Sequence, residues 1–310
     1  MKIAFVFPGQ GSQSVGMLNA WADDAAVRQT LEQASEALGQ DLAELISEGP
    51  ADDLNLTTNT QPVMLASAVA TYAAWRAAGG AEPAVVAGHS LGEYSALTAA
   101  GSMSLADAVR IVRIRADAMQ AAVPVGTGAM AAVLGLSDED VLALCAQASG
   151  TEIVEAVNFN APAQVVIAGH KSAVERACEL AKEKGAKRAL LLPVSAPFHS
   201  SLLKPAADVL QSALAGIAVN EPSVPVINNV DVARQTDPAA IRDALVRQAW
   251  HPVRWVETVQ AMKAQGVTHI VECGPGKVLN GLTKRIDKDL VGLAITDPAS
   301  LQAALDLLQG

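Results

Sequence analysis

The sequence predicts an α/β protein, and two observations support this class. Strand-like and helix-like segments alternate along the whole chain, which is typical of a sheet covered by helices. Apolar residues make up 51% of the chain but aromatic residues only 3%, so the core must consist of Ala, Val, Leu and Ile. Such a core suits parallel strands that are buried on both faces. At 310 residues the chain is long enough for one or two domains.

The first 125 residues are expected to alternate between buried strands and helices. The uncharged stretch 57–75 is Ala-rich but opens with Thr, Asn and Gln, so it predicts a buried helix and falls short of a membrane span. Ser104 has the side chain to cap a helix. The expected elements are a strand ending at Phe7, a helix over 57–75, a strand over 84–87, a helix over 93–100 and a helix from Ser104 to about residue 122.

The order of elements changes between residues 126 and 194, where a smaller domain is expected. The predicted elements there are a strand over 129–134, a helix from Ser137 to about 147, strands over 153–157 and 164–168, a helix over 172–184 and a strand over 189–192. This βαββαβ order predicts a ferredoxin-like fold. We interpret residues 126–194 as an insertion into a discontinuous core made of residues 1–125 and 195–310.

The most informative motif is Gly88-His89-Ser90-Leu91-Gly92, which lies between a predicted strand and a predicted helix. A G-x-S-x-G turn in this context holds its serine on a sharp, strained bend, with the hydroxyl exposed at the sheet edge. The N-terminus of the following helix favours developing negative charge. Ser90 is therefore the candidate nucleophile. The alternative is a Gly-Ser turn that only connects two elements.

A nucleophilic serine needs a base, and the chain has five histidines. His199 follows the strand over 189–192 in an irregular segment, and catalytic residues favour loops at strand ends. This position makes His199 one candidate base, and the family resemblance described below favours it. The other four are expected to be structural or solvated: His89, His170, His251 and His269.

Three segments together resemble the malonyl-CoA:acyl carrier protein transacylase family of bacterial fatty acid synthesis. They are FPGQGSQ at residues 7–13, GHSLGEY at 88–94 and PFHS at 197–200. The resemblance covers essentially the whole chain and implies an α/β-hydrolase-like core with a mostly parallel sheet. Acyltransferase domains of polyketide synthases share these motifs within larger chains, so a chain of 310 residues is expected to be the discrete enzyme.

The glycine loop after the first strand illustrates what the resemblance adds. Gly9-Gln10-Gly11 begins like a dinucleotide fingerprint, but Ser14 occupies the position of the third glycine, which argues against a Rossmann site. The resemblance instead implies that the backbone N–H groups of Gln10 and Leu91 form an oxyanion hole. Two fixed donors of this kind are what an acyl-transfer intermediate requires.

Arg115 lies at the edge of the apolar stripe of the predicted helix 104–122. An arginine directed toward a core needs an anionic partner, because an unpaired buried charge is costly. The pattern alone favours an internal salt bridge with Asp or Glu. The resemblance implies instead that Arg115 pairs with the free carboxylate of a malonyl group, for which the guanidinium fork is suited.

No Asp or Glu stands out as a third triad member. The resemblance implies that the backbone carbonyl of Gln248 orients the imidazole, and we expect its side chain to be an ordinary helix-end residue. Gln61 and Asn160 match polar positions near the family's pocket, but either could equally be a turn residue. Phe198 matches a position that favours malonyl over α-branched units.

The implied mechanism is ping-pong transfer through malonyl-Ser90, with malonyl-CoA and acyl carrier protein as substrates and neither metal nor redox cofactor. A serine hydrolase would use the same elbow and base but release its acyl group to water. A silent carrier-binding scaffold would lack Ser90 or His199, and both are present. Lys284-Arg285, near Lys277 and Lys288, or Lys187-Arg188 could provide the basic patch that an acidic carrier protein requires.

Charge and cysteine content restrict the location and the partners. The net charge of −10 argues against nucleic acid, whose binding depends on Lys and Arg. The three cysteines show no CxxC spacing, which indicates free thiols in a reducing compartment: Cys145, Cys178 and Cys273. Pro8 ends the first apolar run too early for a signal peptide. We therefore expect a cytoplasmic monomer that does not contact the membrane.

Overall fold

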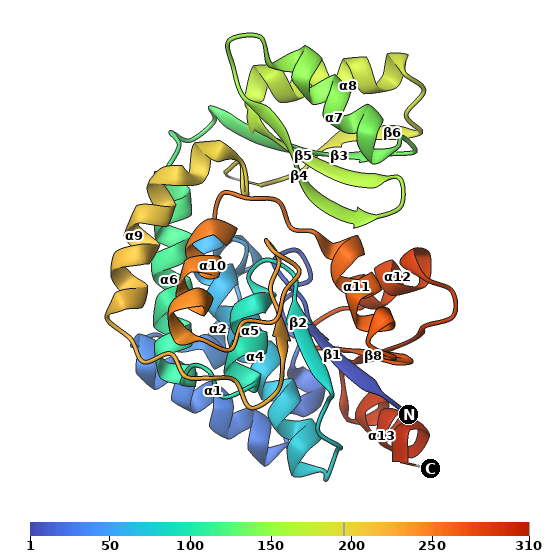
Figure 1. Ribbon diagram of the computed structural model, residues 1–310. Helices are drawn as coiled ribbons and strands as arrows, with labels where there is room; N and C mark the ends of the chain where they lie inside the picture. The colour runs from blue at the N-terminus through green and yellow to red at the C-terminus, as the bar shows by residue number, and fades with distance from the viewer. Residues whose placement is uncertain (195, 310) are drawn as a thin grey trace.

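The computed structural model describes residues 1–194 and 196–309, which form two β-sheets with helices packed on them (Figure 1). One sheet has five parallel strands in the order β7-β2-β1-β8-β9: Val226–Ile227, Val85–Gly88, Ile3–Phe7, His269–Cys273 and Val291–Ile295. The other has four antiparallel strands in the order β4-β5-β3-β6: Val154–Ala161, Gln164–His170, Gly128–Leu134 and Arg188–Leu191. The predicted mixed α/β class with a mostly parallel sheet is confirmed.

The parallel sheet is buried on both faces because its strands alternate between two apolar clusters. In β1, Phe5 and Phe7 lie on one face, whereas Ala4 and Val6 lie on the other. The first face is covered by α1 (Ala25–Leu38), α4 (Thr57–Ala77), α5 (Gly92–Ala99), α6 (Leu105–Ala121), α9 (Lys204–Ala215), α10 (Pro238–Gln248) and α13 (Pro298–Gln309). The second is covered by α11 (Trp255–Ala264) and α12 (Val278–Ile286).

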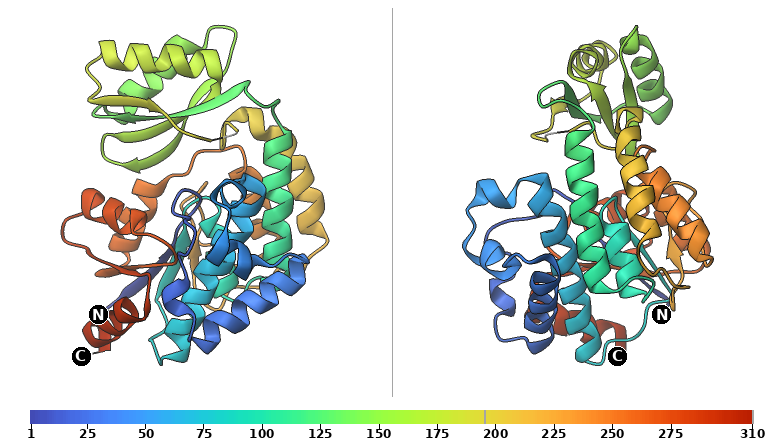
Figure 2. Two further views of the ribbon diagram at one scale, coloured as in Figure 1. Left: turned by 180° about the vertical axis from the view of Figure 1, so that it is seen from behind. Right: turned by 90° about the vertical axis from the view of Figure 1, so that its left-hand side faces the viewer.

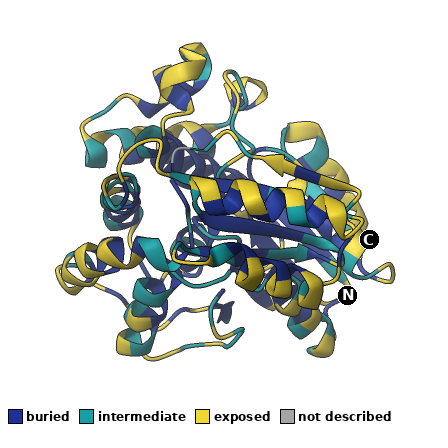
Figure 3. Ribbon diagram, turned by 90° about the horizontal axis from the view of Figure 1, so that it is seen from above, coloured by how far each residue is buried: buried dark blue, intermediate teal, exposed yellow. Residues whose placement is uncertain are grey.

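Two helices cover the outer face of the antiparallel sheet. Figures 1 and 2 show α7 (Asp138–Ser149) and α8 (Lys171–Glu183) on its outer side, with the parallel sheet on the other. Buried residues lie beneath the exposed outer surfaces of the helices when the molecule is seen from above (Figure 3). The strands alternate here too: Ala131 and Val133 pack under the helices, whereas Met130 faces the parallel sheet with Val166. This inner face is therefore available to line a site.

All six elements predicted between residues 126 and 194 are present, but β4 is longer than expected. The prediction stopped at residue 157 because Asn158 and Asn160 interrupt the apolar run. The strand continues to Ala161 because it pairs with β5 as far as Gln164, through two register shifts. Phe159 N also donates to Val253 O over 3.0 Å, and Val253 N donates to Val157 O over 2.9 Å. These bonds also join the antiparallel sheet to the segment that precedes α11.

Hydrogen bonds fix the start of α6 and connect α6 to α4 beside the site. Ser104 Oγ accepts a hydrogen bond from Asp107 N over 3.0 Å, which confirms the predicted cap of α6. Pro62 lies inside α4 and lacks an N–H, which frees the carbonyl of Thr58. Arg113 Nε donates to that carbonyl over 2.8 Å, so α4 and α6 are tied together beside the site. The remaining short helices are η1 (Asn19–Trp21), α2 (Leu42–Glu48), α3 (Ala51–Leu54) and η2 (Ser201–Leu203).

Candidate active site

Ser90 lies at the turn between β2 and α5, at the carboxyl end of the parallel sheet. Its backbone is in the left-handed region, with φ of 54°, which is strained for a residue with a Cβ. The flanking glycines are required by close backbone approach. A Cβ on Gly88 would lie 1.8 Å from the carbonyl of Gly92, and a Cβ on Gly92 would lie 2.0 Å from Phe7 O. The turn therefore has the geometry of a nucleophile elbow.

His199 is brought to Ser90 from the segment after β6. Its Nε2 lies 2.6 Å from Ser90 Oγ, and its Nδ1 lies 2.8 Å from the backbone carbonyl of Gln248. Since a carbonyl only accepts, Nδ1 carries the proton and Nε2 accepts from the serine hydroxyl. Burial, reinforced by the charge of Arg115, lowers the pKa of His199 to about 3. The imidazole is therefore a neutral base at pH 7.

Arg115 extends from α6 to the same hydroxyl and is 1% exposed. Its Nη2 donates to Ser90 Oγ over 3.1 Å and to Gln248 Oε1 over 3.0 Å, while Nη1 donates to Gln61 Oε1 over 2.8 Å. The guanidinium also lies 5.5 Å from the centre of the Tyr94 ring. Within residues 1–194 and 196–309 no carboxylate forms an ion pair with Arg115. The salt bridge that the pattern favoured is thus not found there.

The side chain of Gln248 differs from our expectation of an ordinary helix-end residue. It is fully buried, and its Nε2 donates to Ser90 O over 2.8 Å and to Glu93 Oε2 over 3.0 Å. With its bond to Arg115, the amide joins the elbow, the guanidinium and a carboxyl group. The expectation was wrong because residue 248 contacts α5 and α6 only in the folded chain, so sequence position alone could not indicate these partners.

Glu93 and Asn229 are structurally central residues that sequence reasoning missed. Asn229 Oδ1 accepts from Ser90 N over 2.8 Å, and Asn229 Nδ2 donates to Gly88 O over 2.7 Å, so one amide holds both sides of the bend. Asn229 N donates to Glu93 Oε2 over 2.9 Å. Burial raises the pKa of Glu93 to about 7, although its hydrogen bonds and Arg115 oppose the shift. The only sequence signal was that Glu93 directly follows the elbow motif.

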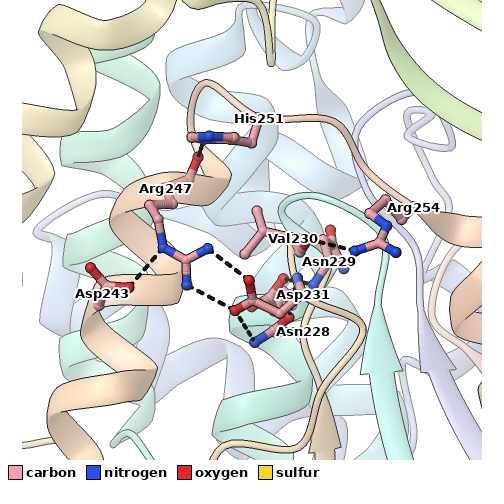
Figure 4. Close-up of polar contacts among 9 residues, drawn as sticks. Asn228, Asn229, Val230, Asp231, Asp243, Arg247, His251 and Arg254 are labelled. Atoms are coloured by element: carbon pink, nitrogen blue, oxygen red, sulfur yellow. Dashed lines mark hydrogen bonds and ion pairs between the residues drawn. The ribbon is translucent and has the colours of Figure 1, made fainter.

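Two arginines fix the loop that carries Asn229 (Figure 4). Arg247 Nη1 and Nη2 each donate to Asp231 over 2.8 Å, and Arg254 Nη1 donates to Val230 O over 3.1 Å. Because Arg247 precedes Gln248 on α10, the loop and the helix that hold the elbow are tied to one another. This outer layer explains why Asn229 is rigidly placed.

The cleft above Ser90 has a volume of about 200 Å³ and lies between the two sheets. Gln10 and Leu91 both line it, and no acceptor in the described part of the chain takes a hydrogen bond from either backbone N–H. Apolar side chains of the antiparallel sheet and of the segment after it form the opposite wall: Met130, Val166, Leu192, Val194 and Phe198. The cleft thus combines a nucleophile, a base, a cation and free N–H donors with an apolar wall.

The remaining candidate residues divide into those at the cleft and those away from it. Gln61 lies inside α4 and Asn160 inside β4, so neither is a turn residue. Asn160 Oδ1 lies 2.7 Å from Nε2 of His89, which also lines the cleft. Burial lowers the pKa of His89. The other histidines lie elsewhere: His170 at the end of β5, His251 after α10 and His269 at the start of β8.

The described residues contain neither a membrane-spanning helix nor a metal site. No helix among them is long and apolar enough to cross a membrane. In residues 1–194 and 196–309, no group of three or more His, Cys, Asp or Glu side chains could hold a metal ion. Cys145, Cys178 and Cys273 are buried free thiols. Burial raises the pKa of each thiol, which makes all three poor nucleophiles.

Comparison with known proteins places this site in a family. The acyl transferase domain model matches residues 4–291. The malonyl CoA-acyl carrier protein transacylase of Escherichia coli K12 is 56% identical over 310 residues, covering 99% of each chain, and that of Bacillus subtilis is 44% identical, covering 99% of this chain and 98% of the relative.

Solved structures agree with these relatives. The acyl-carrier-protein S-malonyltransferase of Burkholderia pseudomallei has a TM-score of 0.98 and 69% identity, covering 99% of this chain and 100% of the other. A malonyl-transacylase in complex with a type II polyketide synthase acyl-carrier protein has a TM-score of 0.98 and 51% identity, with the same coverage. This chain therefore belongs to the acyl transferase family and, within it, to the malonyl-CoA:acyl carrier protein transacylases.

Proposed function

We propose that this enzyme transfers the malonyl group from malonyl-CoA to the phosphopantetheine thiol of an acyl carrier protein, supplying malonyl units for fatty acid synthesis. The observation that carries the proposal is the position of Ser90 Oγ, which lies 2.6 Å from a neutral imidazole and 3.1 Å from a buried guanidinium. The imidazole provides a base, and the guanidinium provides a partner for the acyl carboxylate.

In the first half-reaction, His199 Nε2 takes the proton of Ser90 as Oγ attacks the thioester carbonyl. The resulting oxyanion is stabilised by the N–H groups of Gln10 and Leu91. When the C–S bond breaks, His199 returns the proton to the CoA thiolate and malonyl-Ser90 remains. In the second half-reaction the phosphopantetheine thiol attacks the ester in the reverse sense. Gln248 keeps Nδ1–H in place throughout, and no cofactor takes part.

Malonyl selectivity is assigned to Arg115, whose fork suits a carboxylate. Gln61 orients the guanidinium through its 2.8 Å hydrogen bond. Asn160 holds His89 at the edge of the cleft, and Phe198 limits the room for α-branched units. These roles fit a site that excludes most water and leaves one cation for a substrate anion.

We also propose that residues 126–194 form a ferredoxin-like insertion in an α/β-hydrolase-like core made of residues 1–125 and 195–310. The sheet order β4-β5-β3-β6 with two helices on one face supports the ferredoxin-like part. The strand-elbow-helix unit at Ser90 supports the hydrolase-like part. The catalytic cleft then lies between the core and the insertion. A cytoplasmic, monomeric enzyme without nucleic acid or membrane partners is the corresponding proposal for the whole chain.

The docking surface for the carrier protein is assigned to α12. A second groove, lined by Val278 and Leu282, leads to Gln10 and His89 at the edge of the catalytic cleft. Lys284 and Arg285 lie in the last turn of the same helix. Because carrier proteins are acidic, a basic helix beside a groove that leads to the serine suits their docking better than the Lys187-Arg188 pair at the start of β6.

The test is incubation with radiolabelled malonyl-CoA in the presence and absence of phosphopantetheinylated carrier protein. The proposal expects stoichiometric labelling of the enzyme alone and transfer of the label to the carrier on its addition. Release of the label as free malonate at the same rate with and without carrier would indicate a hydrolase and refute the proposal.

A further inference from the structure

The buried charge of Arg115 is linked to a carboxyl group through one amide. Arg115 Nη2 donates to Gln248 Oε1 over 3.0 Å, and Gln248 Nε2 donates to Glu93 Oε2 over 3.0 Å. Both charged residues are nearly inaccessible, with exposures of 1% and 2%. In a medium of low polarity two such charges interact even through an intervening side chain. Glu93 does not contact Ser90 Oγ or His199, so it has no direct part in bond formation.

We propose that Glu93 is a positioning residue that sets acyl selectivity: its carboxylate balances Arg115 when no acyl carboxylate is bound, and it takes up a proton when a malonyl group pairs with Arg115. This assignment rests on the proposed function, because it requires a substrate carboxylate at the guanidinium. The proton goes to Glu93, from solvent, and no covalent bond to the substrate is involved. Linkage makes the effect reciprocal, so neutral Glu93 strengthens the binding of malonyl groups.

The charges around Glu93 favour such an exchange. Arg115 of α6 is the nearby cation, Asp231 of the loop after β7 is an anion that raises the pKa of Glu93, and Tyr94 and His199 are neutral at pH 7. Burial already raises the pKa of Glu93 to about 7, so a small change in its surroundings alters its charge.

Glu93→Gln separates charge from hydrogen bonding. Both donors to the carboxyl, Gln248 Nε2 and Asn229 N, bind the same oxygen, Oε2. The amide oxygen of Gln can replace Oε2 and keep both bonds. The variant therefore mimics the protonated carboxyl. A matched control is Glu272→Gln, because Glu272 is also fully buried with a pKa raised to about 7, but it accepts from the backbone of α12 at Asn280 N and not from the Arg115 network.

The experiment measures proton uptake by calorimetry when malonyl-CoA or acetyl-CoA binds to Ser90→Ala protein, in buffers that differ in ionisation enthalpy. The phosphates of CoA are common to both ligands, so the difference between the ligands isolates the malonyl carboxylate. At pH 7 we expect the protein to take up about half a proton more when it binds malonyl-CoA than when it binds acetyl-CoA. Glu93, whose pKa is near this pH, is half protonated before binding and fully protonated afterwards.

Adding Glu93→Gln should abolish this excess and tighten malonyl-CoA binding about fivefold or more at pH 8, while acetyl-CoA binding stays the same. Glu272→Gln should keep the excess. The assignment of Glu93 would be overturned if Ser90→Ala protein took up no more protons with malonyl-CoA than with acetyl-CoA. It would also be overturned if the excess uptake persisted in Glu93→Gln, since the proton would then belong to His199. A different result would refute the proposed function: malonyl-CoA and acetyl-CoA bind with equal affinity, and Arg115→Ala changes neither affinity. Failure of the Glu93 assignment and failure of the proposed function are therefore distinguishable.

Discussion

Arg115 donates a hydrogen bond of 3.1 Å to the hydroxyl of Ser90, although the two residues come from different elements. A cation at this distance favours the negative charge that develops on Oγ as the proton moves to His199. The same cation disfavours protonation of His199, for which Arg115 is the largest cause of a lowered pKa after burial. One guanidinium thus affects both the nucleophile and the base, and in the proposed function it also pairs with the acyl carboxylate.

Substitution of Arg115 should change the preference of the enzyme for malonyl over acetyl thioesters. Arg115→Ala should lower kcat/KM for malonyl transfer by a factor of roughly 10²–10³, because a buried carboxylate loses its partner. Acetyl transfer should change little or rise. Arg115→Lys should rescue malonyl transfer poorly, since an ammonium lacks the fork. The measurement is kcat/KM for both thioesters in all three proteins. Equal losses for malonyl and acetyl would show that Arg115 acts on Ser90, His199 or the fold and not on the acyl carboxylate.

The pH dependence of Ser90 reactivity should report the lowered pKa of His199. A histidine with an ordinary pKa of 6.5 would lose its base function as pH falls from 7 to 5, but His199, with a pKa of about 3, remains neutral over this range. Modification of Ser90 by a sulfonyl fluoride should therefore be nearly independent of pH between 5 and 8. In Arg115→Ala the pKa should rise, because a cation is removed, but stay below 6.5, because burial remains.

Wild-type labelling that falls with a midpoint near 6.5 would contradict this account of His199. The rate of modification, followed by intact mass, requires no acyl carboxylate. Loss of malonyl binding in Arg115→Ala therefore does not affect this measurement.

Asn229 should be required for the shape of the elbow. Asn229→Ala removes the hydrogen bonds to Ser90 N and Gly88 O from a fully buried site, and each lost bond costs about 1–3 kcal/mol. We expect a lower Tm and a kcat reduced by about tenfold or more with KM for malonyl-CoA unchanged. The neighbouring Asn228→Ala, whose side chain bonds Asp231 outside the elbow, is the matched control. Equal kcat in the two variants would refute the role of Asn229.

The fold was predictable where a local pattern determined it. Ser104 and Ser137 cap α6 and α7 as the sequence indicates, because a cap depends on a few adjacent residues. The end of β4 was not predictable, since its pairing with β5 passes through two register shifts, which interrupt the alternating pattern expected of a strand. Strand β7 has only two residues, which is too short for any periodicity to be seen.

The site residues also divide into those that a local motif indicates and those that depend on contacts between distant segments. Ser90 was identified from its own motif, whereas the selection of His199, Gln10 and Arg115 depended on resemblance. Asn229 lies 139 positions from Ser90, and a lone Asn after a short apolar run has no distinctive signal. The partners of Gln248 and Glu93 depend on how α5, α6 and α10 meet, which no local pattern encodes.

Charge reversal on α12 should weaken carrier protein binding alone. Lys284→Glu with Arg285→Glu should raise KM for the carrier protein about tenfold at low salt and leave KM for malonyl-CoA nearly unchanged, because charges at the edge of an interface act mainly on encounter. The same reversal at Lys187 and Arg188, at the start of β6, is the control. If KM for the carrier is constant across salt and both reversals, α12 is not the docking surface.

The central claim is that Ser90 carries the malonyl group, and peptide mapping of the acyl-enzyme tests it most directly. Protein incubated with malonyl-CoA without carrier protein is quenched in acid, digested and analysed by mass spectrometry. We expect one malonyl group per chain on the peptide that contains Ser90, and none on Ser90→Ala protein that retains its native circular dichroism spectrum. Malonyl on Cys145, Cys178 or Cys273, or labelling that persists in Ser90→Ala, would contradict the mechanism.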